Sequence, residues 1–224
     1  MSEVAVKEKE PLFSKKNKKL ITDPLNDTNP VTIQVLGICS ALAVTVKMDA
    51  ALVMSMAVLA VLIIGNVIVS LMRNMIPGKI RIIVQLVVVA ALVIIVDQVL
   101  KAFVYDVSKQ LSVFVGLIIT NCIIMGRLEA FALANKPWAS ALDGLGNGIG
   151  YGVILVVVAF FKELFGSGTL LGYEIFGNAT DMTGLYAMGY ENNGMMLLPP
   201  SSLVLVAIYI WIQKSRNPSL QEGH

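Results

Sequence analysis

Long apolar stretches dominate this chain and exclude an ordinary soluble fold. Six of them, 16 to 23 residues long, cover 31–46, 50–72, 80–100, 111–126, 148–165 and 196–212. An α-helix needs roughly 17 to 25 apolar residues to cross a hydrocarbon core about 30 Å thick. Over the whole chain 56% of the residues are hydrophobic and 14% are charged, whereas soluble domains carry about 25% charged residues. The sequence therefore predicts an all-α, polytopic membrane protein with six transmembrane helices.

The first and fourth stretches are short for a full crossing, and each holds one of the two cysteines, Cys39 and Cys122. Irregular backbone at membrane depth is tolerated only where protein buries it or a cavity hydrates it. We therefore expect short or broken segments packed inside the bundle, with both cysteines near the middle of the membrane.

A repeated signature follows both cysteine-bearing stretches. The first is followed by Lys47-x-Asp49-Ala50 and the second by Arg127-x-Glu129-Ala130. The spacing from the cysteine to the basic residue differs, at eight and five residues. We expect two three-helix repeats, about 30–103 and 108–216, and an odd number of spans in each repeat gives them opposite topology in the membrane.

The basic residues predict the orientation. Thirteen of the 17 Lys and Arg residues fall in the terminal tails and in the loops after the second and fourth spans. By the positive-inside rule this side is cytoplasmic. The expected organisation is a cytoplasmic tail at 1–29, one membrane domain at 30–216 and a cytoplasmic tail at 217–224.

Composition also bears on partners and ligands. The formal net charge of +2 gives no basic face for nucleic acid, so no nucleic-acid partner is expected. The single histidine is His224, which argues strongly against a His-ligated haem or zinc site within the chain.

Glycines alternate at the start of the fifth stretch, at positions 144, 146, 148, 150 and 152. No offset among them gives Gly-x-Gly-x-x-Gly after a strand, so a dinucleotide fold is rejected. Gly144, Gly148 and Gly152 share one helical face at small-x-x-x-small spacing, which favours close helix packing over phosphate binding.

Several charged residues lie near the predicted span ends. Asp97 precedes Lys101 by four residues, and we favour a local i,i+4 pair over a cation site. The adjacent residues Lys162 and Glu163 leave the same two interpretations open. The signature pairs Lys47 with Asp49 and Arg127 with Glu129 are expected to anchor the chain at the membrane interface.

The cysteines themselves admit several interpretations. They could be small buried hydrophobes, a disulfide or redox-reactive thiols. Their duplicated placement favours a metal site, since two soft thiolates suit iron and sulfide. An iron–sulfur site generally needs four ligands, so a second polypeptide would have to supply two.

The sequence resembles the membrane subunits of the bacterial sodium-translocating NADH:quinone oxidoreductases and of the related Rnf electron-transfer complexes. The resemblance runs from about residue 27 to the last span. It is most specific in Asn29-Pro30, QVLGICSALAV at 34–44, VDQVLKA at 96–102, SKQLSVFVGLIITNC at 108–122, MGR at 125–127 and KELFGSG at 162–168. The stretch 108–122 is more similar to the sodium pump than to its Rnf relative.

This resemblance implies a function. In the family, such a subunit pairs with a homologous E-type subunit of inverted topology, and a [2Fe-2S] cluster is held between them by two cysteines from each. The matching residues are Cys39 and Cys122, as cofactor-binding and metal ligands, and none is catalytic. The complex would lie in the bacterial inner membrane and carry electrons from NADH to quinone while sodium moves outward. FAD, FMN, NADH and quinone would be bound by other subunits.

Neighbours of the cysteines would then matter for the cluster. Ser40, Thr120 and Asn121 lie within two residues of them in the sequence and are candidate hydrogen-bond donors around the site, or else polar contacts between helices. Two rival functions stay open: an inverted-repeat secondary transporter or ion channel without a redox centre, and a purely structural scaffold of a membrane complex.

Overall fold

The structure is a computed structural model, and it describes residues 20–25, 28–103, 115–170, 173–174 and 194–216. The described residues are predominantly helical. The elements in order are η1 (Asp23–Leu25), α2 (Ile38–Val44), α3 (Met48–Met72), α4 (Arg81–Phe103), α6 (Val115–Ile119), α7 (Cys122–Arg127), the π-helix η2 (Leu128–Ala132), α8 (Pro137–Gly166), β1 (Thr169–Leu170), β2 (Tyr173–Glu174), α9 (Gly194–Leu197) and α10 (Pro199–Arg216). The two strands form one antiparallel pair.

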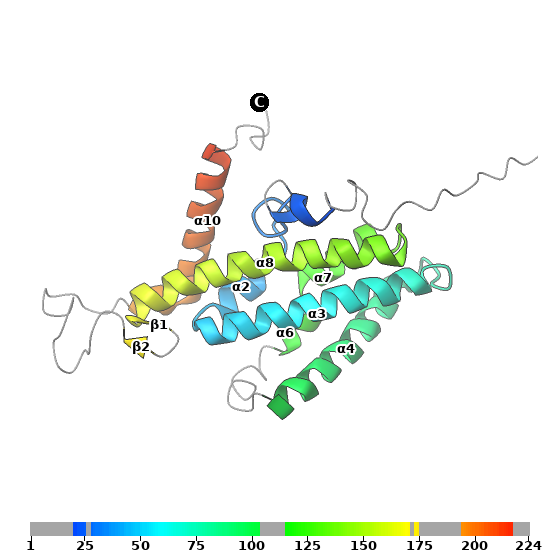
Figure 1. Cartoon of the computed structure of the whole chain (residues 1–224), viewed down its shortest axis with the longest axis horizontal. Helices are drawn as coiled ribbons and strands as arrows, with labels where there is room; N and C mark the ends of the chain where they lie inside the picture. The colour runs from blue at the N-terminus through cyan, green and yellow to red at the C-terminus, as the bar shows by residue number, and fades with distance from the viewer. Residues whose placement is uncertain (1–19, 26–27, 104–114, 171–172, 175–193, 217–224) are drawn as a thin grey trace, which may run out of the picture.

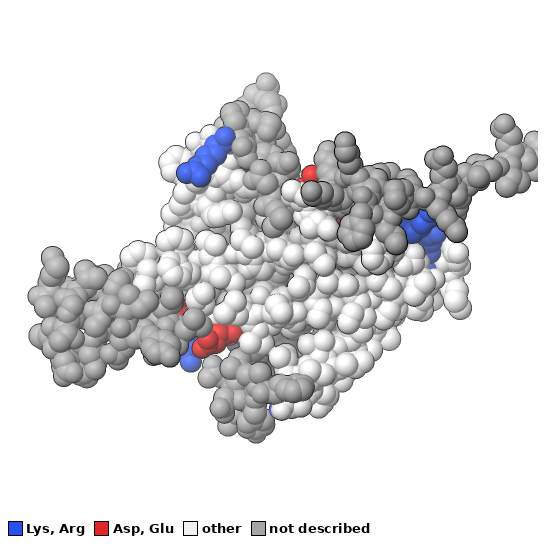
Figure 2. All heavy atoms as spheres, in the orientation of Figure 1, with Lys and Arg blue, Asp and Glu red and all other residues white. Residues whose placement is uncertain are grey.

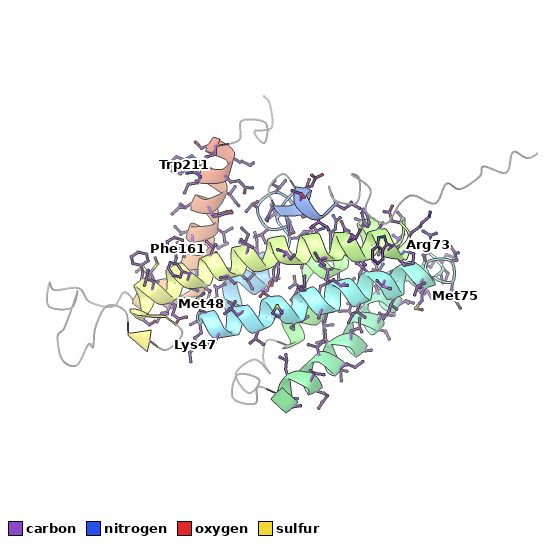
Figure 3. The ribbon with its side chains drawn as sticks, in the orientation of Figure 1. Lys47, Met48, Arg73, Met75, Phe161 and Trp211 are labelled. Carbon is purple, nitrogen blue, oxygen red and sulfur yellow. The ribbon has the colours of Figure 1, made fainter. Side chains whose placement is uncertain are left out.

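Two long antiparallel helices, α3 and α8, form the centre of the molecule and lie side by side (Figure 1). The start of α3, marked by Lys47 and Met48, lies near the end of α8 that carries Phe161, and Arg73 lies at the opposite end (Figure 3). Their buried apolar side chains join those of α2, α7 and η2 in one core, which includes Met54, Val58, Leu62, Ile123, Leu128, Ile154 and Val158.

Glycines allow α8 to approach its neighbours on two faces. A Cβ atom added to Gly144 would lie 3.3 Å from the Cα atom of Ile63, and one added to Gly148 would lie 3.3 Å from the Cα atom of Leu59. On the other face, a Cβ atom on Gly146 would lie 2.6 Å from the carbonyl oxygen of Leu20. The prediction that the glycine stripe serves close packing is therefore confirmed.

The first and fourth apolar stretches are broken, as the sequence predicts. In the first, an irregular segment precedes the seven-residue helix α2. In the fourth, α6 ends at Ile119, Thr120 and Asn121 interrupt the helix, and α7 begins at Cys122.

Three helices in the described part of the chain are long and apolar enough to cross a membrane: Met48–Met72, Arg81–Ala102 and Pro137–Gly166. The charged side chains on the face seen in Figure 2 gather near the helix ends, with an uncharged surface over α3 and α8 between them. These three helices have the length and composition of membrane spans. The arrangement of six spans in two inverted repeats stays a prediction.

Two predicted spans differ from the structure. The fifth is predicted at 148–165, but α8 already begins at Pro137, because the small and polar residues of its first turns are buried by other segments rather than exposed to lipid. The sixth, predicted at 196–212, overlaps α10, Pro199–Arg216, which runs away from α8 rather than alongside it and is not one of the three spanning candidates (Figure 1). Trp211 points outward from it (Figure 3). The tails at 1–19 and 217–224 lie outside the described residues.

Candidate functional site

The two cysteines, 83 positions apart in the sequence, come together in the structure. Cys39 is the second residue of α2, and Cys122 is the first residue of α7. The two thiols lie close enough to interact with each other electrostatically. Both thiols are free and exposed. The chain therefore presents two adjacent sulfur donors on its surface.

A strained backbone leads into the first cysteine. Gly37 precedes α2 with φ 80°, and Val35 adopts φ 57°. A positive φ is a genuine outlier for a β-branched residue, and only tertiary contacts maintain it. An added Cβ atom on Gly37 would lie 2.9 Å from Cε2 of Tyr151, so both the conformation and the space require glycine here.

The residues next to the cysteines point into the protein and form a buried polar cluster. The Tyr151 hydroxyl donates to Ser40 Oγ at 2.6 Å, and the Asn121 amide donates to Ser40 Oγ at 3.3 Å and to Tyr151 Oη at 3.4 Å. Asn121 also caps α7, because its Oδ1 accepts from the Ile123 N–H. Of the three neighbours that the sequence singled out, Ser40 and Asn121 are brought together, whereas Thr120 is exposed and donates to the carbonyl oxygen of Gly116 in α6.

Tyr151 is the member of this cluster that the sequence reasoning missed. It lies in the glycine-rich part of α8 and is fully buried. A single tyrosine within a membrane-length run of glycine and aliphatic residues was a usable signal, since a buried Tyr hydroxyl needs a hydrogen-bond partner.

The donor set fits part of an iron–sulfur site. Cysteine thiolates are the usual ligands of such clusters, and four are required. Among the described residues, no group of three or more His, Cys, Asp or Glu side chains is placed to hold a metal ion. The whole sequence has only these two cysteines. Two exposed, neighbouring thiols are what one half of a shared ligand set would present.

A buried ion pair lies at the end of α7 opposite Cys122. Arg127 forms two hydrogen bonds to the Asp143 carboxylate, one of them from Nε at 3.0 Å, and its guanidinium lies 5.5 Å from the Phe131 ring centre. Asn147 Nδ2 also donates to Asp143 Oδ1 at 3.1 Å. Arg127 thus pairs inside the protein with Asp143, a carboxylate that the sequence reasoning did not single out, because the two lie on different helices.

Two further carboxylates, those of Glu129 and Asp97, are also paired with basic side chains. Glu129, in the π-helix, forms a salt bridge with Arg81 and accepts a hydrogen bond from Gln85 at 3.0 Å. Asp97 and Lys101 form the expected i,i+4 pair at 2.5 Å, which confirms the local interpretation.

The adjacent residues Lys162 and Glu163 contact different parts of the protein. Lys162 is fully buried and its Nζ donates to Ser202 Oγ at 2.9 Å, while Glu163 accepts from the backbone N–H of Met48 at 2.6 Å. Ser202 Oγ also lies 3.3 Å from Thr45 Oγ1. These contacts tie the end of α8 to α10, to the end of α2 and to the start of α3.

A family model described as "Rnf-Nqr subunit, membrane protein" matches residues 17–210. The chain belongs to the Rnf-Nqr family. The family resemblance found in the sequence is therefore confirmed, and so is the assignment to a membrane.

Relatives within this family are similar along nearly the whole chain. The D-type subunit of the Na(+)-translocating NADH-quinone reductase of Photobacterium profundum is 54% identical over 210 residues, which cover 94% of this chain and 98% of the relative. The D-type subunits of the same reductase from Shewanella halifaxensis and Shewanella loihica are each 52% identical, with the same coverage.

Proposed function

We propose that this chain is the D-type subunit of a sodium-translocating NADH:quinone reductase and that Cys39 and Cys122 hold one half of a [2Fe-2S] cluster. The observation that carries the proposal is the meeting of two exposed thiols from segments far apart in the sequence. Support comes from the relatives, which are named as this subunit and match almost the full length.

The second half of the ligand set would come from the homologous E-type subunit, inserted with opposite topology. When bound, the cluster supplies a one-electron relay across a hydrocarbon layer that otherwise insulates. This chain would ligate the cluster through its two sulfurs and supply nearby amide and hydroxyl groups. FAD, FMN, NADH and quinone would be bound by other subunits, so no catalysis is expected from this chain alone.

The complex-level reaction is NADH oxidation coupled to quinone reduction and outward sodium transport. A complex with this activity would lie in the bacterial inner membrane. Both termini would face the cytoplasm, since the basic residues favour that side.

The test is replacement of each cysteine in the intact complex. Cys39→Ser and Cys122→Ser should each lose the iron, the acid-labile sulfide and the electron paramagnetic resonance signal of one binuclear cluster, with quinone reduction lost as well. Thr120→Ser is the matched control, because Thr120 lies two residues before Cys122 and its exposed hydroxyl donates to the carbonyl oxygen of Gly116. It should retain all three signals.

The rival functions predict other outcomes. A transporter or channel without a redox centre would bind no iron in the wild-type chain and its partner. A structural scaffold would keep normal quinone reduction in both cysteine variants. Normal iron content together with normal quinone reduction in both variants would remove the proposal.

A further inference from the structure

Three buried side chains connect the two cysteine-bearing turns to the middle of α8. Ser40 directly follows Cys39, Asn121 directly precedes Cys122, and Tyr151 comes from α8. All three are fully buried. They come from three segments, and Asn121 and Ser40 are 81 positions apart in the sequence.

The hydrogen bonds of this cluster allow a single arrangement of protons. Ser40 Oγ lies 2.8 Å from the carbonyl oxygen of Gly37, which can only accept, so the serine hydroxyl donates there. The serine oxygen then accepts from the Tyr151 hydroxyl and from the Asn121 amide, which uses both its lone pairs. The second Asn121 N–H donates to Tyr151 Oη. Each hydroxyl thus donates one hydrogen bond and accepts at least one, and such satisfied buried networks fix a unique geometry.

The tyrosine ring is held as firmly as its hydroxyl. The added-Cβ position on Gly37 lies 2.9 Å from Cε2 and 3.2 Å from Cδ2 of Tyr151. The turn before Cys39 therefore packs directly on the Tyr151 ring. The Tyr151 hydroxyl meets Ser40, beside Cys39, and Asn121, beside Cys122. The ring and the hydroxyl together fix one cysteine-bearing turn relative to the other.

We propose that Tyr151 is a positioning residue that sets the relative placement of the Cys39 and Cys122 sulfurs through Ser40 and Asn121. Tyr151 shows no hydrogen bond to either sulfur among the described residues, so it acts on the thiols through its two neighbours. As far as the cluster is concerned, this inference rests on the proposed function. Groups that orient metal ligands without touching the metal commonly tune affinity and potential.

The first experiment measures the thiol pair without any cluster. Dibromobimane bridges two nearby thiolates, each of which displaces one bromide, and becomes fluorescent when both have reacted. The full-length chain has only two cysteines, so the fluorescence of the purified, cluster-free protein reports this pair alone. Tyr151→Phe should bridge roughly five-fold more slowly than wild type, the scale expected for a lost buried hydrogen bond. Labelling by monobromobimane, which needs one thiol, should be unchanged.

Two further variants complete this test. Ser40→Ala removes the same connection from the other side and should slow bridging similarly, and the double variant should show little further loss because both changes act on one network. Tyr209→Phe is the matched control, since Tyr209 is half-buried on α10 and outside the cluster. It should bridge at the wild-type rate.

The second experiment uses the intact complex. Tyr151→Phe should retain iron but shift the electron paramagnetic resonance spectrum and the midpoint potential of the cluster, whereas Tyr209→Phe should shift neither. Unchanged bridging in both Tyr151→Phe and Ser40→Ala, with an unchanged cluster spectrum, would overturn the inference. Retention of iron in Cys39→Ser would instead overturn the proposed function, and the bridging experiment would still decide whether Tyr151 positions the thiols.

Discussion

Glu163 near the end of α8 accepts a hydrogen bond from the backbone N–H of Met48, the first residue of α3, at 2.6 Å. The first N–H groups of a helix have no partner within the helix, and its N-terminus carries a partial positive charge. A carboxylate from a neighbouring helix satisfies both needs. The contact therefore stabilises α3 and also sets its position along α8.

Removing this acceptor should destabilise the protein. Glu163→Ala is expected to lower the free energy of unfolding by about 1–2 kcal/mol, in the range of other lost N-terminal caps. Glu163→Gln keeps an acceptor without the charge and should lie between Ala and wild type. The measurement is denaturant-induced unfolding of the purified chain in mild detergent, followed by circular dichroism.

Asp97→Asn provides the comparison for this prediction. Its partner Lys101 has a side chain that is 45% exposed, and an i,i+4 pair of this kind contributes about 0.5 kcal/mol at most. A loss in Asp97→Asn as large as that in Glu163→Ala would show that removal of any carboxylate, rather than loss of the cap, explains the effect.

The Arg127–Asp143 pair should be strongly coupled. The Asp143 side chain is 2% exposed and the Arg127 side chain 16% exposed. Breaking a buried pair leaves one uncompensated charge and costs about 3–5 kcal/mol. We expect Arg127→Met and Asp143→Asn each to destabilise the chain by an amount near this range.

The double variant tests the pairing itself. Arg127→Met together with Asp143→Asn removes both charges and should recover much of the loss, giving a coupling energy of about 1–3 kcal/mol in a double-mutant cycle of unfolding free energies. Strictly additive losses would show that the two side chains are stabilised by other groups.

The sequence predicts the bounds of some helices closely, because the length of the apolar stretch alone determines where these helices begin and end. The spans expected at 50–72 and 80–100 correspond to α3, Met48–Met72, and α4, Arg81–Phe103. Continuous apolar residues of spanning length have few alternatives to a helix in a membrane.

The start of α8 could not be predicted in the same way. Its first turns contain Asp143, Gly144 and Asn147, which look like a polar loop in the sequence. Other segments cover the first two of these residues: Arg127 of α7 pairs with the Asp143 carboxylate, and α3 packs on Gly144. These compensating contacts exist only once the chain has folded.

The candidate site likewise has one part that the sequence predicts and one that it does not. The duplicated setting of Cys39 and Cys122 was visible in the sequence, and the structure brings the two together. Tyr151 was not identified because its partners, Asn121 and Ser40, precede it by 30 and 111 positions. Hydrogen bonds over such separations leave no local pattern.

Gly144 should tolerate no larger residue. An added Cβ atom would lie 2.9 Å from Nδ2 of Asn66 and 3.3 Å from the Cα atom of Ile63, so α3 and α8 would have to separate. Gly144→Ala is expected to cost about 1–3 kcal/mol in the same unfolding measurement, as in other overpacked cores. Gly116→Ala, in α6, meets nothing within 4 Å and should be neutral or slightly stabilising. Equal effects of the two changes would contradict the close packing.

The final prediction concerns Lys162 and Ser202. Lys162 Nζ donates to Ser202 Oγ, and in the described part of the chain this is the only hydrogen-bond or ion-pair partner found for the amine. Ser202→Ala would leave a buried amine without that partner and should cost about 1–3 kcal/mol. Lys162→Met removes the amine and fills similar volume, while Ser202 Oγ keeps its contact with Thr45 Oγ1, so the free energy of unfolding should change by less than about 1 kcal/mol or rise.

The decisive result is which of these two variants loses more unfolding free energy. Lys162→Met in the Ser202→Ala background should recover most of the lost stability, because no amine is then left without a partner. Ser201→Ala is the control on the same helix, since its hydroxyl bonds to the carbonyl oxygens of Met196 and Leu198 nearby rather than to Lys162. A larger loss in Lys162→Met than in Ser202→Ala would mean that the lysine amine binds a group other than Ser202, and the buried amine would then have to be explained by that group.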